Sequence, residues 1–384
     1  MSRIPLSVPS ISGNEMKYLK ECIDSEWVSS AGSFVGQFES KISDYTGSRY
    51  AIAVVNGTSA LHLSLMISGV GHNDEVIIPT VTFIAPVNAI TYCGASPIFM
   101  DSDEFFNIDV EKTIEFLTNE TITKKGYTYN KTTNKRIAAI VPVHVWGNAV
   151  DIEQLVGICK EKNIEIIEDA SESLGTRYNS KKLEGKHTGT IGSFGCISFN
   201  GNKIITTGGG GMILTNKQKF AEKAIYLSTQ AKDDPKRYIH NNVGYNYRIT
   251  NIQAALGVGQ LEQLEKFINL KKAIRQSYLS HFKDISGITL SPSPNYANNN
   301  YWLNVIHINE EKYGRSINDL NEKFEANNIE VRPVWMLNHL QKPFKHYQSY
   351  NIENAIKQIK NSLCIPSSTK LSNEDIEKIA RVMK

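Results

Sequence analysis

A single lysine, Lys203, stands between Ser198 and four consecutive glycines, Gly208 to Gly211, in the stretch SFNGNKIITTGGGGMI. A lysine beside a ligand crevice can form an imine with a carbonyl compound, above all where burial or a cationic neighbour lowers the pKa of its amine. It can also clamp a phosphate or lie solvated in a loop. The residue alone leaves these roles open, and frequency alone favours the solvated loop.

Two further segments carry groups that suit a ligand. The segment NGTSA (56–60) ends a predicted strand and opens a predicted helix, so its amides and the hydroxyls of Thr58 and Ser59 suit a phosphate. An ordinary helix cap is the alternative. The segment IIEDAS (166–171) places Asp169 after an apolar strand, where an acid faces the ligand crevice of an α/β sheet. A helix cap or a loop acid is the alternative for Asp169.

The glycine run lacks the context of two nucleotide-binding motifs. No Gly-Lys-Ser/Thr follows it, which excludes a Walker loop. It does not lie between a first strand and a helix with an acid about 20 residues further on, so the fingerprint of a nicotinamide-dependent oxidoreductase is missing. We expect a close backbone approach beside a ligand, or a turn into the strand MILTN (212–216).

These groups are more specific together than singly. A phosphorylated pyridine aldehyde needs a phosphate cradle, an aromatic side chain against its ring, a carboxylate at its ring nitrogen and a lysine at its aldehyde. The chain supplies these groups in one order: NGTSA, Phe83, Asp169, Ser198 and Lys203. The combination predicts a site for pyridoxal phosphate.

Short apolar strands alternate with helical patterns through the first half of the chain. The predicted strands span 51–55, 75–79, 96–100, 137–143, 164–169, 193–199 and 210–216. The predicted helices start near residue 58 and span about 83–92, 109–117 and 151–162. This alternation predicts a mostly parallel sheet with helices on both faces. Residues 119–136 interrupt the pattern and predict a polar surface hairpin or loop.

A long helical pattern opens at about Thr250 and spans 251–282, with Leu256, Leu261, Leu264 and Ile268 at roughly helical spacing. Shorter helical and strand-like pieces follow it. We therefore expect a large cofactor-binding domain over residues 1–249 and a smaller C-terminal α+β domain over residues 250–384. The N-terminal segment 1–30 is expected at the edge of the active site.

The composition excludes several classes of protein. Hydrophobic residues make up 41% and charged residues 21% of 384 residues, which is ordinary for a soluble globular enzyme. The net charge of +3 comes without a Lys/Arg stripe, so no nucleic-acid partner is expected. No apolar run has membrane-spanning length, and the first residues resemble no signal peptide. Five scattered cysteines without C-x-x-C spacing predict reduced thiols in a cytoplasmic protein and no metal site.

The chain resembles the sugar aminotransferases of the DegT/DnrJ/EryC1/StrS family, a branch of the fold-type I pyridoxal-phosphate enzymes. The resemblance runs nearly from end to end. Its motifs are WVSSAG (27–32), NGTSAL (56–61), PTVTFIAP (79–86), EDAS (168–171), SFNGNK (198–203), GGGGMI (208–213), GYNYRITNIQAALG (244–257) and RPVW (332–335) with His339. Within the family the chain is most similar to the LegC-like group, which aminates C4 of a UDP-linked 4-keto-6-deoxy-N-acetylhexosamine.

The resemblance implies an α/β fold with a seven-stranded type of sheet, and it implies roles for individual residues. Lys203 forms the aldimine with pyridoxal phosphate and, once released, shuttles the proton. Asp169 pairs with the ring nitrogen and Phe83 stacks on the ring. The other implied cofactor contacts are Gly57, Thr58, Ser59 and Ser198 at the phosphate, Glu172 near the ring, and Asn246 from the partner of a homodimer. The implied substrate residues are Ser29, Ser30, Tyr301, Arg332 and His339, whereas core packing is favoured for Trp302.

The implied reaction moves an amino group from L-glutamate to the 4-keto carbon of UDP-2-acetamido-2,6-dideoxy-hexos-4-ulose, through a pyridoxamine phosphate intermediate. The product would serve surface glycan biosynthesis. A GDP- or dTDP-linked keto-sugar is the alternative substrate, including perosamine-type or 3-amino products. A pyridoxal-phosphate sugar dehydratase is disfavoured because that branch replaces the imine lysine, as a rule by histidine. A non-catalytic sensor is disfavoured by the intact Lys203, Asp169 and Ser198.

Glu172 departs from the common family pattern, since many members have Gln or His three residues after the aspartate. An ionised Glu172 beside the cofactor's phenolate oxygen would be repelled. Glu172 is therefore expected to be either protonated or turned away. The usual Gly-Asp before the lysine segment is Gly192–Ser193 here.

Overall fold

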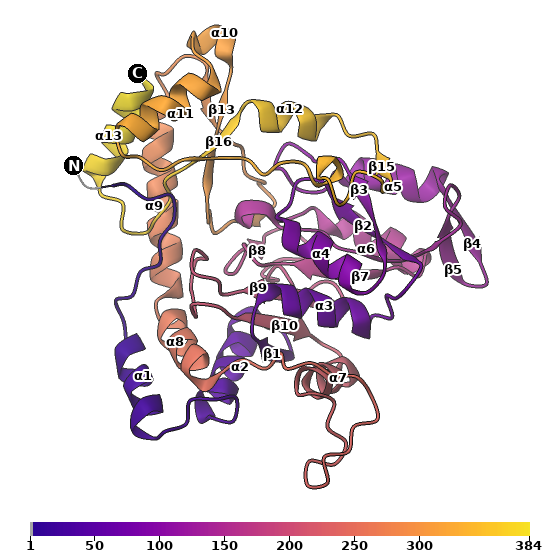
Figure 1. Ribbon diagram of the computed structural model, residues 1–384. Coiled ribbons are helices and arrows are strands. Elements are labelled where there is room, and N and C mark those ends of the chain that lie inside the picture. The colour runs from indigo at the N-terminus through magenta and orange to yellow at the C-terminus, as the bar shows by residue number, and fades with distance from the viewer. Residues whose placement is uncertain (1–2) are drawn as a thin grey trace.

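The computed structural model describes residues 3–384, and one large sheet lies at its centre (Figure 1). Along its main path the strands are β1 (Tyr50–Val54), β10 (Gly211–Thr215), β9 (Phe194–Ser198), β7 (Glu165–Asp169), β6 (Arg136–Ile140), β2 (Asp74–Pro79), β3 (Ser96–Met100) and the two-residue β15 (Ser349–Tyr350). Neighbours are parallel, except that β10 is antiparallel to β1 and to β9. The predicted mostly parallel sheet is confirmed.

Helices cover both faces of this sheet because its strands carry apolar side chains on both faces. In β2, Val76 and Ile78 belong to one core, whereas Ile77 between them belongs to another. This alternation follows from the two-residue period of a strand. The first core includes residues of α3 (Gly57–Ile67), α4 (Ile84–Tyr92) and α7 (Gln218–Ser228), and the second includes residues of α5 (Val110–Asn119) and α6 (Ile152–Glu161).

The long helical pattern after Thr250 forms two helices, α8 (Asn251–Leu261) and α9 (Leu264–Phe282), which corrects the single helix that the pattern suggested. They contact different neighbours. Helix α8 packs against α1 (Glu15–Asp24) and α2 (Ser33–Thr46), whereas α9 packs against α13 (Asn373–Met383) and β11 (Ile288–Leu290). Because the chain breaks between the two helices, α8 can pack against α1 and α2 while α9 packs against α13 and β11.

The C-terminal part builds a second, smaller sheet. Its order is β11-β13-β16-β14, with β13 (Asn304–Ile308), β16 (Ser362–Ile365) and β14 (Arg332–Pro333). Helices α9, α11 (Ile317–Ala326) and α13 share a core with it. The remaining short elements are α10 (Glu310–Tyr313), α12 (Asn354–Lys360), η1 (Val145–Gly147), η2 (Asn338–Leu340) and the pair β8 (Arg177–Tyr178) and β12 (Ala297–Asn298). A division of the chain at residues 249 and 250 stays a prediction, because α8 packs on α2 and β15 pairs with β3 of the large sheet.

The segment 119–136 forms an antiparallel hairpin, as its polar composition predicted. Strands β4 (Thr121–Lys124) and β5 (Tyr127–Asn130) pair with each other, and Tyr129 pairs with Arg136 of β6. Figure 1 shows this hairpin projecting from the end of the molecule that carries α5. Across residues 3–384, the helices are all too short or too polar to cross a lipid bilayer.

Candidate active site

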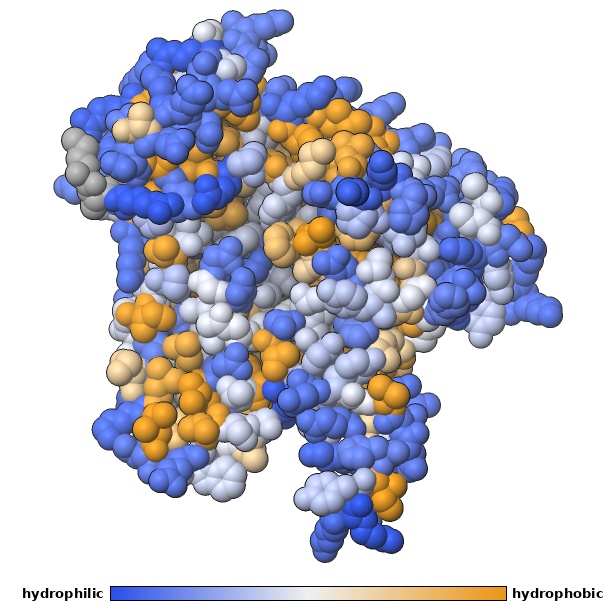
Figure 2. Space-filling view, in the orientation of Figure 1, coloured by the Kyte–Doolittle hydropathy of each residue, from blue (hydrophilic) through white to orange (hydrophobic). Residues whose placement is uncertain are grey.

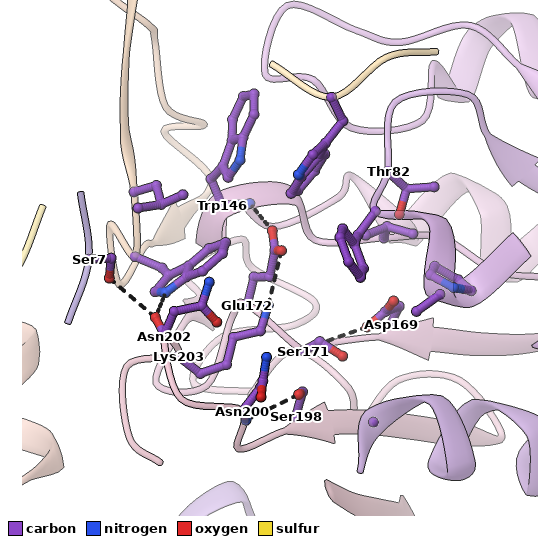
Figure 3. Close-up of a pocket in the computed structure, with 18 of the residues that line it drawn as sticks. Ser7, Thr82, Trp146, Asp169, Ser171, Glu172, Ser198, Asn200, Asn202 and Lys203 are labelled. Carbon is purple, nitrogen blue, oxygen red and sulfur yellow. Dashed lines mark hydrogen bonds and ion pairs between the residues drawn. The ribbon is translucent and has the colours of Figure 1, made fainter. Parts of the chain in front are cut away.

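A cavity of about 790 Å³ opens where the parallel strands end. Strands β2, β6, β7 and β9 each lead into segments that line it, which is the position at which α/β sheets bind ligands. Strand β14 with the residues after it and the chain around Trp302 form the opposite wall, and Leu6 and Ser7 of the N-terminal segment also line it. The cavity therefore lies between the two sheets (Figure 3).

Lys203 points its amine into this cavity from the turn that follows β9. The turn is closed by a hydrogen bond of 3.1 Å from the amide of Lys203 to the carbonyl of Asn200, and the buried Ile204 and Ile205 anchor the chain beyond it. The Nζ atom lies 3.1 Å from Oε1 of Glu172 and 4.1 Å from the centroid of the Trp302 ring. Lys203 is thus held within the cavity, and the solvated-loop alternative is wrong.

Glu172 faces Lys203 and is buried. Its second oxygen, Oε2, accepts a hydrogen bond from the backbone amide of Trp146 at 2.8 Å. Burial raises the pKa of the Glu172 carboxyl and the charge of Asp169 adds to this, whereas Lys203 and the Trp146 amide oppose it. Figure 3 shows the carboxylate between Lys203 and Trp146. Glu172 therefore lines the cavity beside Lys203.

Asp169 ends strand β7 and is also buried within the cavity wall. Its Oδ1 accepts a hydrogen bond from the Ser171 amide at 3.0 Å. Burial raises the pKa of Asp169, and the Ser171 hydrogen bonds and the charge of Lys203 oppose the rise. The cavity holds two buried acids close to one lysine, so a positively charged ligand group beside Asp169 would be stabilised there.

The amino end of α3 forms another part of the cavity wall, with Gly57 and Thr58 beside Ser198. Asn56 caps this helix, because its side chain accepts from the Ser59 amide at 2.8 Å. The amides of the first turn have no acceptor within the helix and carry the positive end of its dipole. This end of the cavity suits a phosphate.

The glycine run brings β10 against the amino end of α3. A Cβ atom at Gly211 would lie 2.5 Å from the carbonyl carbon and oxygen of Asn56 and 2.8 Å from the Gly57 nitrogen. Gly208 has a φ of +78°, in the left-handed region that favours glycine. The predicted turn into the strand is confirmed, and the close approach that the run makes is to the amino end of α3.

Aromatic side chains form the apolar wall of the cavity. Phe83 at the start of α4 lines it, and its ring centroid lies 6.3 Å from that of Trp335. The Trp335 ring lies 5.6 Å from the Trp146 ring. Trp302 is buried, as predicted, and also lines the cavity. Sequence reasoning assigned no role to Trp146 or Trp335, because Trp146 lies in the short η1, Trp335 lies in a loop, and no local spacing relates either of them to Lys203.

Among the expected substrate residues, Arg332 lines the cavity. Its guanidinium contacts Glu330 Oε1 at 2.6 Å, and Arg3 contacts the other oxygen of Glu330 at 3.1 Å. Both arginines are more than half exposed, with relative exposures of 61% and 67%. Two guanidinium groups therefore flank the Glu330 carboxylate, which lines the cavity together with Arg332.

Other expected site residues lie outside the cavity of a single copy. Ser29 and Ser30 are exposed, and the Ser29 carbonyl accepts from the Asn251 amide. Asn246 is exposed and accepts from Gln230 at 2.9 Å. Ser59 is buried in the first turn of α3.

Tyr301 and His339 also lie outside this cavity. The Tyr301 ring lies 4.9 Å from the Arg275 guanidinium, and Tyr301 has a φ of +52°. His339 Nδ1 contacts Thr80 Oγ1 at 2.7 Å, and burial lowers the pKa of His339. In one copy of the chain these residues therefore do not line the cavity.

The residues present fit pyridoxal phosphate. The cavity combines a helix amino end for a phosphate, a buried carboxylate for a ring nitrogen, and aromatic side chains for a ring. Lys203 supplies an amine for the aldehyde. Gly57 lies so close to Ser198 that a Cβ on it would be 2.9 Å from the Ser198 Cβ, so the amino end of α3 and the Ser198 side chain meet there.

Comparisons with known proteins agree with this fit. Residues 9–384 match the DegT/DnrJ/EryC1/StrS aminotransferase family. The GDP-perosamine synthase of Caulobacter vibrioides is 35% identical over 381 residues, which cover 99% of this chain and 97% of that protein. EpsN of Bacillus subtilis, a proposed pyridoxal phosphate-dependent aminotransferase, is 33% identical over 99% of this chain and 95% of its own length.

A solved structure gives the same result for the fold. The DegT DnrJ EryC1 StrS aminotransferase from Brucella abortus superposes with a TM-score of 0.86 at 25% identity, covering 96% of this chain and 94% of that one. The family fold predicted from the sequence motifs is therefore confirmed. The chain belongs to the DegT/DnrJ/EryC1/StrS aminotransferase family and is a pyridoxal phosphate-dependent sugar aminotransferase.

Proposed function

We propose that this enzyme transfers the amino group of L-glutamate to the 4-keto carbon of a GDP-linked 4-keto-6-deoxy sugar. The similarity to a GDP-perosamine synthase over 99% of the chain supports the GDP-linked substrate. In this proposal the GDP-linked sugar replaces the UDP-linked 2-acetamido sugar that was expected from the sequence. The observation that carries the chemistry is the convergence of Lys203, Asp169 and the amino end of α3 on one cavity.

Each of these residues has a defined task in the proposed reaction. Bound pyridoxal phosphate supplies an electron sink and carries the amino group between the two substrates. Asp169 would hold a proton at the ring nitrogen of the bound cofactor, and Phe83 would pack against its ring. The amides of Gly57 and Thr58, with the Ser198 hydroxyl, bind the phosphate.

Lys203 holds the cofactor and acts as the base. When its amine is free, it takes the proton from Cα of glutamate, and in the second half-reaction it returns a proton to C4 of the sugar. One lysine serves both halves, so ping-pong kinetics are expected.

The mouth of the cavity receives the nucleotide part of the substrate. Arg332 and Arg3 flank Glu330, and a diphosphate can take the place of that carboxylate between the two guanidinium groups. Trp335 and Phe83 offer apolar surface between the mouth and Lys203. The sugar is therefore proposed to enter with its keto carbon foremost.

A homodimer is the proposed active unit. Figure 2 shows apolar side chains gathered over the region of α1, where Met16, Ile23, Trp27 and Val28 are exposed. The loop after α7 projects from the molecule and exposes Val243 (Figure 1). Asn246 follows this loop, and a second copy would bring it to the phosphate of the neighbouring site. Light scattering of the purified protein tests this: a monomer that binds the cofactor fully would contradict it.

The absorption spectrum tests the reaction. The cofactor-loaded enzyme should show a visible band that L-glutamate bleaches and that the GDP-linked keto-sugar restores. The UDP-linked 4-keto-6-deoxy-N-acetyl sugar serves as the matched comparison, since it differs in the nucleotide and at C2. Recovery with the UDP-sugar alone would contradict the GDP assignment, and bleaching that neither sugar reverses would contradict both substrates.

A further inference from the structure

The pair formed by Glu172 and Lys203 is almost fully enclosed. The side chains have relative exposures of only 5% and 13%. One carboxylate oxygen contacts Nζ at 3.1 Å, and the other accepts the Trp146 amide at 2.8 Å. Nζ also lies over the ring of Trp302. The carboxylate and the ring both stabilise the ammonium form of Lys203.

An ammonium group cannot attack a carbonyl carbon, because its nitrogen has no lone pair. Lys203 must therefore lose a proton before it can bind the cofactor, and it must gain one when it takes a proton from a substrate carbon. A proton acceptor within direct hydrogen-bond distance removes the need for bulk water in a buried cavity.

Glu172 is the acceptor in direct contact. Asp169 is the other acid in this wall, but its Oδ1 is bonded to the Ser171 amide and its place is at the ring nitrogen. Cys364 also lines the cavity near Glu172, and burial raises the pKa of its thiol to about 12, so it stays protonated. Burial favours a neutral carboxyl at Glu172, in agreement with its raised pKa.

We propose that Glu172 stores the proton of Lys203: the ammonium gives a proton to Oε1 of Glu172 when the lysine binds the cofactor, and Glu172 returns it only when the cofactor leaves the site, so that the amine released during turnover stays free to take a substrate proton. One N–H bond breaks and one O–H bond forms, leaving an amine and a carboxylic acid with the net charge of the pair unchanged. The proposal rests on Lys203 as the cofactor-binding lysine. It assigns Glu172 as a positioning and proton-holding residue.

Trp146 keeps Glu172 in place for this exchange. Its amide is aimed at Oε2 by a backbone with φ of +53° and ψ of +19°, a region that a bulky residue rarely adopts. The hydrogen bond from Trp146 engages Oε2, so Oε1 remains directed at Lys203 in both protonation states. The strained backbone at Trp146 therefore fixes which oxygen receives the proton.

Infrared difference spectroscopy tests the proposal on the full-length protein. Adding pyridoxal phosphate to the apoprotein should produce a carboxylic acid C=O band that shifts in D₂O and that is absent in Glu172→Gln. The proposal is overturned if the wild type gives no such band, or if the band persists in Glu172→Gln and disappears in Asp169→Asn. These outcomes can be read whether or not any sugar is aminated.

A second measurement uses the apoprotein alone. The pH dependence of Lys203 acetylation by acetic anhydride, followed by mass spectrometry, should move to lower pH in Glu172→Gln, because the carboxylate 3.1 Å from Nζ is removed. Glu330→Gln removes the same charge at the mouth of the cavity and should leave the profile unchanged. If Glu172→Gln fails to fold, Glu172→Asp should give a smaller displacement of the profile, because the shorter acid moves away from Nζ. Equal profiles in wild type and a folded Glu172 variant would refute the proposal.

Discussion

The amine of Lys203 lies over the face of Trp302, with Nζ 4.1 Å from the ring centroid. The indole N–H of Trp302 also donates to the carbonyl of Asn202 at 2.7 Å, so Trp302 holds both the amine and the backbone that precedes it. Trp302 lies just before β13 of the small sheet, and Lys203 follows β9 of the large one. This contact joins the two parts of the chain at the reacting amine.

Replacing Trp302 should therefore weaken cofactor binding without removing it. Trp302→Leu loses the ring and the N–H, and a cation–π contact is worth about 0.5–2 kcal/mol. We expect the dissociation constant for pyridoxal phosphate to rise about tenfold, measured by titration of the visible band. Trp302→Phe keeps a ring and should lose less. If Phe and Leu behave alike, the ring contact contributes nothing, and the hydrogen bond to Asn202 carries the effect.

Lys203→Ala should abolish both the visible band of the loaded enzyme and amino transfer. We expect the rate to fall at least about a thousandfold, since both the covalent anchor and the base are lost. Initial rates with glutamate and a keto-sugar nucleotide measure this. Lys203→Arg keeps the positive charge beside Glu172 but should be as inactive as Ala. Appreciable activity in the Arg variant would show that charge, rather than the amine, is what the reaction needs.

The strands of the large sheet could be predicted from the sequence because each is a short apolar run between turn residues. Val76, Ile77 and Ile78 are all buried, so no amphipathic period was needed to recognise β2. The break between α8 and α9 was missed because Leu261 and Leu264 keep helical spacing across it. Strand β15 has only two residues, Ser349 and Tyr350, and two residues are too few to show the alternation of a strand in the sequence.

The cavity was predictable where its residues belong to local motifs. Asp169, Ser198 and Lys203 each end or follow a strand, and the direction of the parallel strands brings them to one edge. Trp146 comes from η1 and Trp335 from the loop after β14, and only the packed structure brings their rings within 5.6 Å. Spacing in a sequence carries no information about such a contact.

Gly211→Ala should damage the phosphate end of the cavity. The new Cβ would lie 2.5 Å from the Asn56 carbonyl, so the amino end of α3 must move. We expect the free energy of unfolding to fall by about 1–3 kcal/mol, with weaker binding of pyridoxal phosphate. Gly209→Ala is the matched control in the same glycine run, because a Cβ there would lie 3.7 Å from its nearest neighbour, Gln253 Nε2. Equal losses in the two variants would contradict a steric cause. Thermal unfolding and cofactor titration measure both effects.

Because of Lys271, the free energy of unfolding should rise as the pH becomes alkaline. Its Nζ donates to the carbonyl of Trp302 at 2.8 Å and also to the carbonyl of Ser367, and burial lowers its pKa to about 7. In the unfolded chain a lysine keeps its proton up to about pH 10.4. Between these values the unfolded state binds more protons, so stability rises with pH from about 7 to about 10.

The variant Lys271→Met removes the titrating group while keeping an unbranched side chain of similar length. The difference in unfolding free energy between wild type and variant should therefore grow in favour of the wild type as pH rises through this window, by about 1.4 kcal/mol per pH unit. Denaturant unfolding at several pH values measures it, and the same series on Lys272→Met controls for the loss of one neighbouring lysine. A difference that is constant with pH would mean that Lys271 stays charged in the folded protein. In that case the two carbonyls alone stabilise its buried ammonium.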